Sequence, residues 1–271
     1  MKKFRDAVVV VTGGGSGIGE ATVRAFHDLG AIVHVVDIDE DRAHRVAQDL
    51  GTRAFAHVVD VSNAAAVEAL AEDVYARHGR VDVLVNNAGV GHGGLVHEIP
   101  LADWKWVLDI NLWGVIHGVH SFVPRMIDQG GDAHIVNTAS LAGLIGVPSM
   151  APYCTSKFAI VGMSESLGAE LAPHRIRVTA VCPGVIATDI VRASRIGEAI
   201  AGTRARIEAY YRKRGIKPEK VARDIVAAVR AERPLQLTIG AAYPALWLRR
   251  LSPRLFRGAA SLLARRILSG A

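Results

Sequence analysis

Tyr153 and Lys157 are the residues of this sequence whose types and spacing are best suited to chemistry. They lie four positions apart in the segment APYCTSKFAI, directly after a proline, where a helical pattern runs from 153 to 171. Residues four apart on a helix share one face, so the phenol and the ammonium point in the same direction. A free tyrosine, with a pKa of about 10, is a poor base at neutral pH, and a neighbouring ammonium lowers that pKa. The pair predicts a tyrosine that exchanges protons, but the same spacing also occurs by chance. Other motifs of the chain are needed to distinguish a catalytic pair from a chance one.

The elements that would position this pair alternate regularly along the chain. Short segments rich in β-branched residues occur at 7–14, 31–37, 54–61, 81–89, 133–140, 176–184 and 235–240. Helical patterns lie between them, at 17–29, 40–50, 63–78, 102–127, 153–171 and 218–231. Apolar strands that alternate with helices indicate a parallel sheet covered on both faces. We therefore expect an α/β fold, a Rossmann-type doubly wound sheet of about seven parallel strands with ligands beyond their carboxyl ends.

The turn after the first expected strand is rich in glycine and reads TGGGSGIGEA. It departs from the usual G-x-G-x-x-G pattern, because its spacing is T-G-x-x-x-G-x-G. The physics is the same, since glycines permit a tight turn and a helix N-terminus attracts a pyrophosphate. The predicted dinucleotide-binding residues of this turn are Gly13, Ser16, Gly17, Ile18 and Gly19.

The second expected strand ends at Asp37, whose carboxylate can accept hydrogen bonds from an adenosine ribose and would repel a 2′-phosphate. Because the neighbours Ser16 and Ile38 are not basic, NAD is favoured over NADP. Asp37 could instead cap the helix that begins near Glu40. Asp60 and Val61, after the third strand, are placed to meet the adenine, although Asp60 could also be a helix cap.

Composition bounds the class of protein. The chain has 271 residues, of which 50% are hydrophobic, enough for one α/β domain or at most two small ones. Two cysteines cannot form a disulfide framework, so we expect a cytoplasmic protein. Glycines and prolines interrupt the longest uncharged stretch, so this stretch is not expected to span a membrane. His117 and His120 are three apart on an expected helix but lack a metal-binding motif, so no metal site is expected.

Charge is distributed unevenly. Residues 1–191 hold 14 Lys and Arg against 21 Asp and Glu, a balance of −7, whereas residues 192–271 hold 18 against 5, a balance of +13. A strongly basic C-terminal third favours anionic partners such as lipid headgroups, phosphates or acidic carriers. No nucleic-acid partner is expected, because no known reading motif accompanies the charge.

Several short motifs now combine. The fourth strand ends in NNAG, an asparagine follows at Asn111, a serine ends the fifth strand at Ser140, and PG follows at Pro183. In this order and near these spacings, together with the glycine turn and Y-x-x-x-K, the chain up to about residue 240 resembles the short-chain dehydrogenase/reductase (SDR) family of the compact NAD(P)-dependent type.

That resemblance implies an NAD-dependent oxidoreductase with four catalytic residues. It implies that Tyr153 exchanges the proton with the substrate oxygen, that Lys157 also holds the nicotinamide ribose, and that Ser140 hydrogen-bonds the substrate oxygen. It also implies that Asn111 anchors a water molecule that relays protons to solvent. Tyr153 and Lys157 would also contact the cofactor, as would the remaining expected positions, Asn87, Ala88, Gly89, Pro183, Gly184, Val185 and Thr188.

The expected substrate pocket is apolar. The loops LAGLIGVPSM after Ser140 and GVIAT after Pro183 lack a fixed charge, which favours a hydrophobic secondary alcohol or ketone such as a steroid, retinoid or lipid. Residues 189–216 fall where the resemblance places a substrate lid, although a solvated basic helix is the alternative. His92 could touch substrate or could simply be packed. Competing functions are reduction of a 3-oxoacyl thioester on coenzyme A or a carrier protein, and a non-catalytic protein that senses the cofactor.

Residues 241–271 exceed the expected catalytic domain, 1–240. In RLFRGAASLLARRIL, an apolar stripe lies opposite arginines, with Trp247 upstream. Such a tail could lie on an anionic membrane, pack on a neighbouring subunit or cover the pocket. The resemblance also implies a homodimer or homotetramer, with a face on the helix that begins near Trp104 and Trp106.

Overall fold

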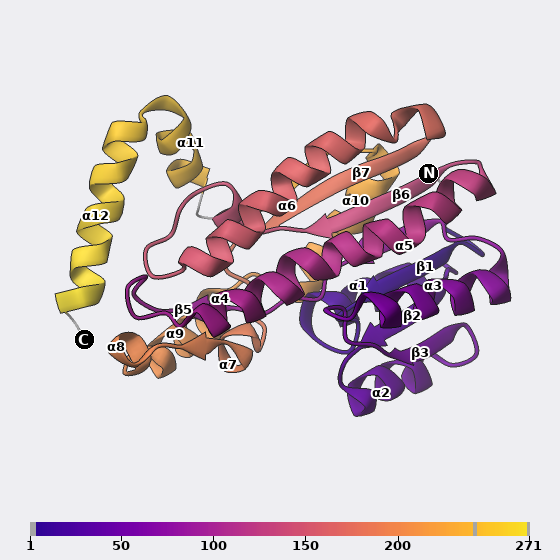
Figure 1. Cartoon of the computed structure of the whole chain (residues 1–271), viewed down its shortest axis with the longest axis horizontal. Helices are drawn as coiled ribbons and strands as arrows, with labels where there is room; N and C mark the ends of the chain where they lie inside the picture. The colour runs from indigo at the N-terminus through magenta and orange to yellow at the C-terminus, as the bar shows by residue number, and fades with distance from the viewer. Residues whose placement is uncertain (1–3, 241–242, 270–271) are drawn as a thin grey trace.

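The structure is a computed structural model that describes residues 4–240 and 243–269. Its centre is a parallel seven-stranded sheet with the order β3-β2-β1-β4-β6-β7-β9 (Figure 1). The strands are β1 (Val8–Thr12), β2 (Ile32–Asp37), β3 (Ala54–Val58), β4 (Val83–Asn86), β6 (Ala133–Thr138), β7 (Ile176–Pro183) and β9 (Leu235–Thr238). Each corresponds to one of the predicted segments, so the predicted doubly wound sheet is confirmed.

Helices cover both faces of the sheet. Successive strand residues point to opposite faces, so neighbouring residues of one strand pack against different helices. Val9 and Val11 of β1 pack in the core that includes α1 (Gly17–His27), α2 (Glu40–Leu50) and α10 (Pro218–Ala231). Val8 and Val10 pack in the core on the other face, with α3 (Ala64–His78) and α5 (Gly114–Gln129). Burial on both faces explains why β1 reads as an unbroken apolar run.

The strand order reverses beside β1, which pairs with β2 on one side and β4 on the other. From β1 the chain continues to β2 on one side, and from β4 it continues to β6 on the other side. A crevice therefore opens at the carboxyl ends of β1 and β4, which is where ligands bind in such sheets. This edge carries the glycine turn and the NNAG segment.

The predicted helix at 102–127 is observed at 101–129, but it contains a distortion. It consists of α4 (Leu101–Leu108), a π-helical turn η1 (Asp109–Trp113) and α5. Asn111 lies inside the π-helical turn. Such turns occur frequently at functional sites because they interrupt the regular backbone hydrogen bonding of a helix.

The segment at 189–216 is not one basic helix but a set of short elements. These are α7 (Ile190–Ala193), β8 (Arg195–Ile196), α8 (Glu198–Ala201) and α9 (Arg204–Arg214). Strand β8 pairs with β5 (His92–Gly93), in the loop that follows β4. In Figure 1 these elements lie together beside α4, at the end of the molecule where the central strands finish.

Two further helices follow the sheet. Helices α11 (Tyr243–Leu251) and α12 (Pro253–Ser269) form a hairpin that stands away from the sheet (Figure 1). The Arg249 guanidinium lies 5.0 Å from the centre of the Phe158 ring of α6 (Ala151–Glu170), which ties the hairpin to the body. Across residues 4–240 and 243–269, none of the helices combines the length and the apolar character needed to cross a membrane.

Candidate active site

Glycines in the turn after β1 allow backbone approaches that no other residue would permit. Gly13 has φ +63, a left-handed conformation that favours glycine. A Cβ added at Gly19 would lie 1.9 Å from the carbonyl oxygen of Gly13, and one added at Gly13 would lie 2.9 Å from Cα of Ala88. The turn is therefore folded tightly back on itself, against the NNAG segment.

The first turn of α1 has the features of an anion-binding site. Ser16 is the N-cap residue of α1, yet its side chain makes no capping hydrogen bond, which leaves the first amides of the helix open toward a ligand. A Cβ added at Gly17 would lie 3.1 Å from Cγ2 of Thr188, so the segment after β7 reaches this helix end. A pyrophosphate fits this cradle, and the predicted residues Gly13, Ser16, Gly17, Ile18, Gly19 and Thr188 lie around it.

Asp37 lies at the end of β2 and faces the same turn. Its Oδ2 accepts a hydrogen bond from the Gly15 amide at 2.9 Å, and its Oδ1 accepts one from the Asp39 amide at 3.1 Å. The residue that caps α2 is Asp39, whose side chain accepts from the Arg42 amide at 3.0 Å. The cap is thus a different residue, and Asp37 stands at the crevice with its carboxylate oriented by two backbone amides.

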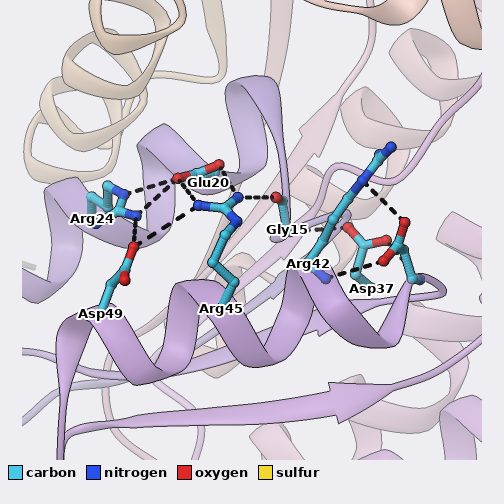
Figure 2. A network of polar contacts seen from close by, with 8 residues as sticks. Gly15, Glu20, Arg24, Asp37, Arg42, Arg45 and Asp49 are labelled. Carbon is cyan, nitrogen blue, oxygen red and sulfur yellow. Dashed lines mark hydrogen bonds and ion pairs between the residues drawn. The ribbon is translucent and has the colours of Figure 1, made fainter.

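Arg45 of α2 is a residue of this region that the sequence did not single out. It donates to the Gly15 carbonyl at 3.0 Å and pairs with Glu20 of α1 at 2.8 Å. Figure 2 shows this network, which continues through Arg24 and Asp49. Hydrogen bonding by Arg45 is the largest cause that lowers the pKa of Glu20 below its usual value. The network fixes α1, α2 and the glycine turn relative to one another.

The NNAG segment is held by a second unpredicted residue, Thr12 at the end of β1. Its hydroxyl accepts hydrogen bonds from the amides of Asn87 at 2.9 Å and of Ala88 at 3.0 Å. The Asn87 side chain in turn donates to the Thr12 carbonyl at 3.0 Å. Because this side chain is engaged with the protein, the segment presents mainly its backbone, including Gly89, to the crevice.

The predicted catalytic pair lies on α6 as expected. The ammonium of Lys157 is buried, donates to the Thr138 carbonyl at 2.7 Å and lies 5.7 Å from the centre of the Tyr153 ring. A Cβ added at Gly89 would lie 3.6 Å from this ammonium and 3.1 Å from Oδ1 of Asn111. Glycine at position 89 thus allows the NNAG segment to approach Lys157 and Asn111 closely.

Ser140 and Asn111 complete the predicted group. Ser140 follows β6, and its side chain accepts a hydrogen bond from the Ala142 amide at 3.1 Å and acts to lower the pKa of the Tyr153 phenol. The Asn111 side chain accepts from the Val90 amide at 2.7 Å and donates to the Val90 carbonyl at 2.9 Å. The structure therefore brings Asn111, Ser140, Tyr153 and Lys157 to one edge of the sheet.

Burial sets the charge states of this group. It raises the pKa of Tyr153 to about 12, while the hydroxyl of Ser140 acts in the opposite direction. Burial also lowers the pKa of Lys157 to about 8. The predicted lowering of the tyrosine pKa is thus wrong for the protein chain by itself, because the desolvation of the phenolate outweighs the favourable interactions.

The remaining predicted cofactor positions lie at the same edge. The Gly184 amide donates to the Thr238 carbonyl at 2.9 Å, and the Val185 carbonyl accepts from the Ile216 amide at 2.9 Å, so the chain after Pro183 is held from both sides. Asp60 accepts from the amide and the hydroxyl of Ser62, at 2.9 and 2.7 Å. Val61 is buried against the π-helical turn and α5, where its carbonyl makes a hydrogen bond with His117 at 2.9 Å.

A large surface cavity of about 1380 Å³ lies between α1 and α10, beside α7 and α9. It touches the crevice at Gly17 and Thr188 but is lined by none of the four catalytic candidates. Within residues 4–240 and 243–269, no cluster of three or more His, Cys, Asp and Glu side chains could hold a metal ion.

Comparison with known proteins agrees with this geometry. Residues 7–199 match the family model for short chain dehydrogenases. The chain is 40% identical over 268 residues to Probable oxidoreductase EphD of Mycobacterium tuberculosis; the match covers 96% of this chain and 45% of that protein. The chain thus spans less than half the length of this curated relative.

Solved structures agree in the same way. A short-chain dehydrogenase/reductase from Burkholderia phymatum, in complex with NAD, superposes with a TM-score of 0.89 at 34% identity, covering 94% of this chain and 96% of that one. A 3-ketoacyl-(acyl-carrier-protein) reductase from Brucella melitensis, complexed with NADH, superposes with a TM-score of 0.78 at 28% identity, covering 88% and 97%. The chain belongs to the short-chain dehydrogenase/reductase family.

Proposed function

We propose that this protein is an NAD-dependent oxidoreductase that interconverts a hydrophobic secondary alcohol and the corresponding ketone. The observation that carries the proposal is the meeting of Asn111, Ser140, Tyr153 and Lys157 beside a turn that fits a pyrophosphate. A proton-transfer group and a dinucleotide cradle at one sheet edge suit hydride transfer, in which the cofactor carries out the redox chemistry and the protein positions and polarises the substrate.

In this proposal the nicotinamide, when bound, supplies the acceptor or donor of the hydride. Ser140 and Tyr153 hold the substrate oxygen through their hydroxyl groups. In the oxidation direction the Tyr153 phenolate takes the proton of the alcohol hydroxyl. The hydride leaves the carbon that bears this hydroxyl, so that a C=O bond forms. In the reduction direction Tyr153 returns that proton to the oxygen.

Lys157 and Asn111 have supporting roles. One donor of the Lys157 ammonium is used on the Thr138 carbonyl, and its other donors remain for the phenol and a ribose hydroxyl. The positive charge lowers the pKa of the phenol once substrate and nucleotide order the site. The Asn111 side chain is engaged with Val90, so a proton-relaying water would be held by the main chain of the π-helical turn.

Support for NAD over NADP comes from Asp37. Two backbone amides orient its carboxylate at the end of β2, where it would accept hydrogen bonds from a ribose and repel a 2′-phosphate. Arg42, which lies nearby, pairs with Asp39 at 3.0 Å. The related structures from Burkholderia phymatum and Brucella melitensis were solved with NAD and NADH.

Support for a hydrophobic substrate comes from the segment that precedes α6. Leu141, Leu144, Val147 and Met150 are half-buried in the stretch between Ser140 and Tyr153. A 3-oxoacyl thioester is the second candidate, favoured by the likeness to the ketoacyl reductase and by the basic C-terminal third. Both candidates place a carbonyl or hydroxyl carbon at the same four residues.

The test follows NADH absorbance with a panel of steroids, retinoids, secondary alcohols and 3-oxoacyl-coenzyme A, each with NAD or NADP and their reduced forms. We expect turnover of a hydrophobic secondary alcohol with NAD. Turnover of the thioester alone would establish the second candidate. Binding of NADH without turnover of any compound would instead support a cofactor sensor.

The α11–α12 hairpin supports a separate proposal, peripheral binding to an anionic membrane. Leu255 and Leu262 of α12 are 65% and 62% exposed, and Trp247 and Leu251 of α11 are also exposed. Residues 243–269 contain arginines and no acidic residue. An exposed apolar stripe with flanking cations is suited to a membrane interface.

This proposal is tested by sedimentation with phosphatidylserine vesicles. We expect the Leu255→Ser, Leu262→Ser double variant to lose vesicle binding, while the control Leu101→Ser, at an exposed leucine of α4, keeps it. Unchanged vesicle binding with a smaller oligomer would assign the stripe to a subunit contact. The expected homodimer or homotetramer is measured in the same preparations by analytical ultracentrifugation.

A further inference from the structure

Asp103 of α4 joins the lid segment to the body of the protein. Its Oδ1 lies 2.6 Å from Nη1 of Arg195 in the lid strand β8. Its Oδ2 lies 3.1 Å from Nε2 of His92 in β5, whose side chain is only 2% exposed. The Arg195 guanidinium also lies 4.1 Å from the centre of the Trp106 ring. Strand β5 and helix α4 thus meet the lid strand β8, which is distant from both in the sequence, at one carboxylate.

Charge reinforces this junction. The hydrogen bond from Arg195 is the largest cause that lowers the pKa of Asp103, and the hydrogen bond from His92 adds to it. Hydrogen bonds to an ionised partner are stronger than neutral ones, and an arginine over an indole gains a further cation–π attraction. The contacts of Arg195 therefore hold β8 more firmly than an isolated surface ion pair would.

The backbone beneath this junction is built for close contact. His92 and Gly93 pair with Arg195 and Ile196 in a parallel bridge, and the Gly197 amide donates to the Gly93 carbonyl at 2.8 Å. A Cβ added at Gly91 would lie 2.2 Å from Oγ of Ser194. The segment GHGG at 91–94 is thus a strip against which the lid packs because glycines leave room for it.

This strip also leads to the substrate side. The Gly94 amide donates to the Ser149 carbonyl at 2.8 Å, in the apolar stretch that precedes α6. The strip therefore connects the lid strand β8 to the apolar stretch that lies between Ser140 and Tyr153 in the sequence.

We propose that Asp103, Arg195 and the glycine strip form a clamp that fixes the closed position of the lid and so controls how tightly substrate is held. Asp103 and Arg195 are positioning residues in this proposal, because they act on the substrate through the lid. The clamp also gives His92 a role, because this residue packs under the lid and orients the Asp103 carboxylate. The proposal rests on the proposed oxidoreductase function, but it has a readout that does not depend on activity.

That readout is cleavage of the lid by trypsin, since the lid carries Arg204, Arg206 and Arg212 and is cut faster when it opens. We expect Asp103→Asn, which keeps every arginine, to be cut roughly tenfold faster at these sites, since a charge-assisted contact is lost. Gly91→Ala should behave in the same way. The controls are Asp109→Asn, which removes a surface pair with Lys105, and Gly202→Ala, at a lid glycine whose Cβ would meet nothing within 4 Å.

The kinetic readout uses cyclohexanol and testosterone as probe alcohols. For whichever probe is turned over, Arg195→Ala should raise KM roughly tenfold and change the dissociation constant of NADH less than twofold, and Arg195→Lys should restore part of the loss. Arg206→Ala, at an exposed lid arginine outside the clamp, serves as the control. The clamp is contradicted if Asp103→Asn and Gly91→Ala are cut no faster than their controls. If no alcohol is oxidised but these variants are still cut faster, the proposed function fails and the clamp stands.

Discussion

The ammonium of Lys157 lies 5.7 Å from the centre of the Tyr153 ring and is anchored by a 2.7 Å hydrogen bond to the Thr138 carbonyl. This anchor uses one of three ammonium donors, and it points the group toward the edge where Gly89 approaches. Lys157 can therefore serve the phenol and the nucleotide together.

Replacement of Lys157 tests this double role. We expect Lys157→Ala to lose turnover and also to weaken NADH binding about tenfold, as loss of a charge-assisted hydrogen bond predicts. NADH affinity is measured by fluorescence titration and turnover by NADH absorbance. Lys220→Ala, on the exposed part of α10, is the control. Unchanged NADH affinity in Lys157→Ala would remove its contact with the cofactor.

Asp37 should determine cofactor preference. We expect Asp37→Ser to shift the ratio of kcat/KM for NAD over NADP by about 100-fold toward NADP, because juxtaposed like charges cost several kcal/mol. Asp39→Ser is the matched control, since Asp39 caps α2 and makes the same kind of backbone contact. Steady-state kinetics with both cofactors measure the ratio. An equal ratio in wild type and Asp37→Ser would show that the carboxylate does not face the ribose.

Gly19 should be required for the nucleotide cradle. A Cβ there would lie 1.9 Å from the Gly13 carbonyl oxygen, so Gly19→Ala must push the turn open. We expect NADH affinity to fall roughly 10- to 100-fold, the range that overpacking of a tight site implies. Gly162→Ala, where a Cβ would meet nothing within 4 Å, is the control. Tight binding by a folded Gly19→Ala protein would refute the proposed cradle.

Stability should fall in mild acid. Burial lowers the pKa of both His34 and His134 to about 3, whereas an unfolded histidine titrates near 6.5. The unfolded chain therefore binds protons first as the pH drops below about 6.5, and the native state loses stability down to the folded pKa. We expect a loss of about 2 kcal/mol for each histidine between pH 6.5 and pH 5.

Urea unfolding at several pH values measures this loss. His34→Phe, which preserves stacking on Phe55, should flatten the dependence, while His44→Phe, at an exposed position of α2, should leave it as in wild type. An unfolding free energy that stays constant between pH 7 and pH 5 would contradict the assigned burial of these imidazoles.

The sheet and the catalytic group could be predicted because their signals are local. Each central strand is a near-continuous apolar run, and Tyr153 and Lys157 share a helix face by spacing alone. The pairing of His92 with Arg195 had no such signal, since each strand has two residues and the partners are distant in the sequence. The GHGG segment was the available hint, because clustered glycines permit close backbone approach.

Other features depend on tertiary structure. Arg45 looks like any charged residue of a helix surface, and only the folded chain shows its contacts with Gly15 and Glu20. The π-helical turn at Asn111 lies within an ordinary helical pattern. The pKa of Tyr153 could not be predicted from its spacing to Lys157, because burial of the phenol, which depends on the folded chain, raises it.

The most direct measurement is single-turnover hydride transfer in the wild type, in Tyr153→Phe and in Tyr210→Phe, a control at an exposed tyrosine of α9. We predict that all three bind NADH within about twofold of one another, since the removed hydroxyl acts on the substrate oxygen. We also predict that only Tyr153→Phe transfers hydride more slowly, by about 100- to 10,000-fold, the usual contribution of a positioned acid–base group. Retention of half the wild-type rate by Tyr153→Phe would contradict the account.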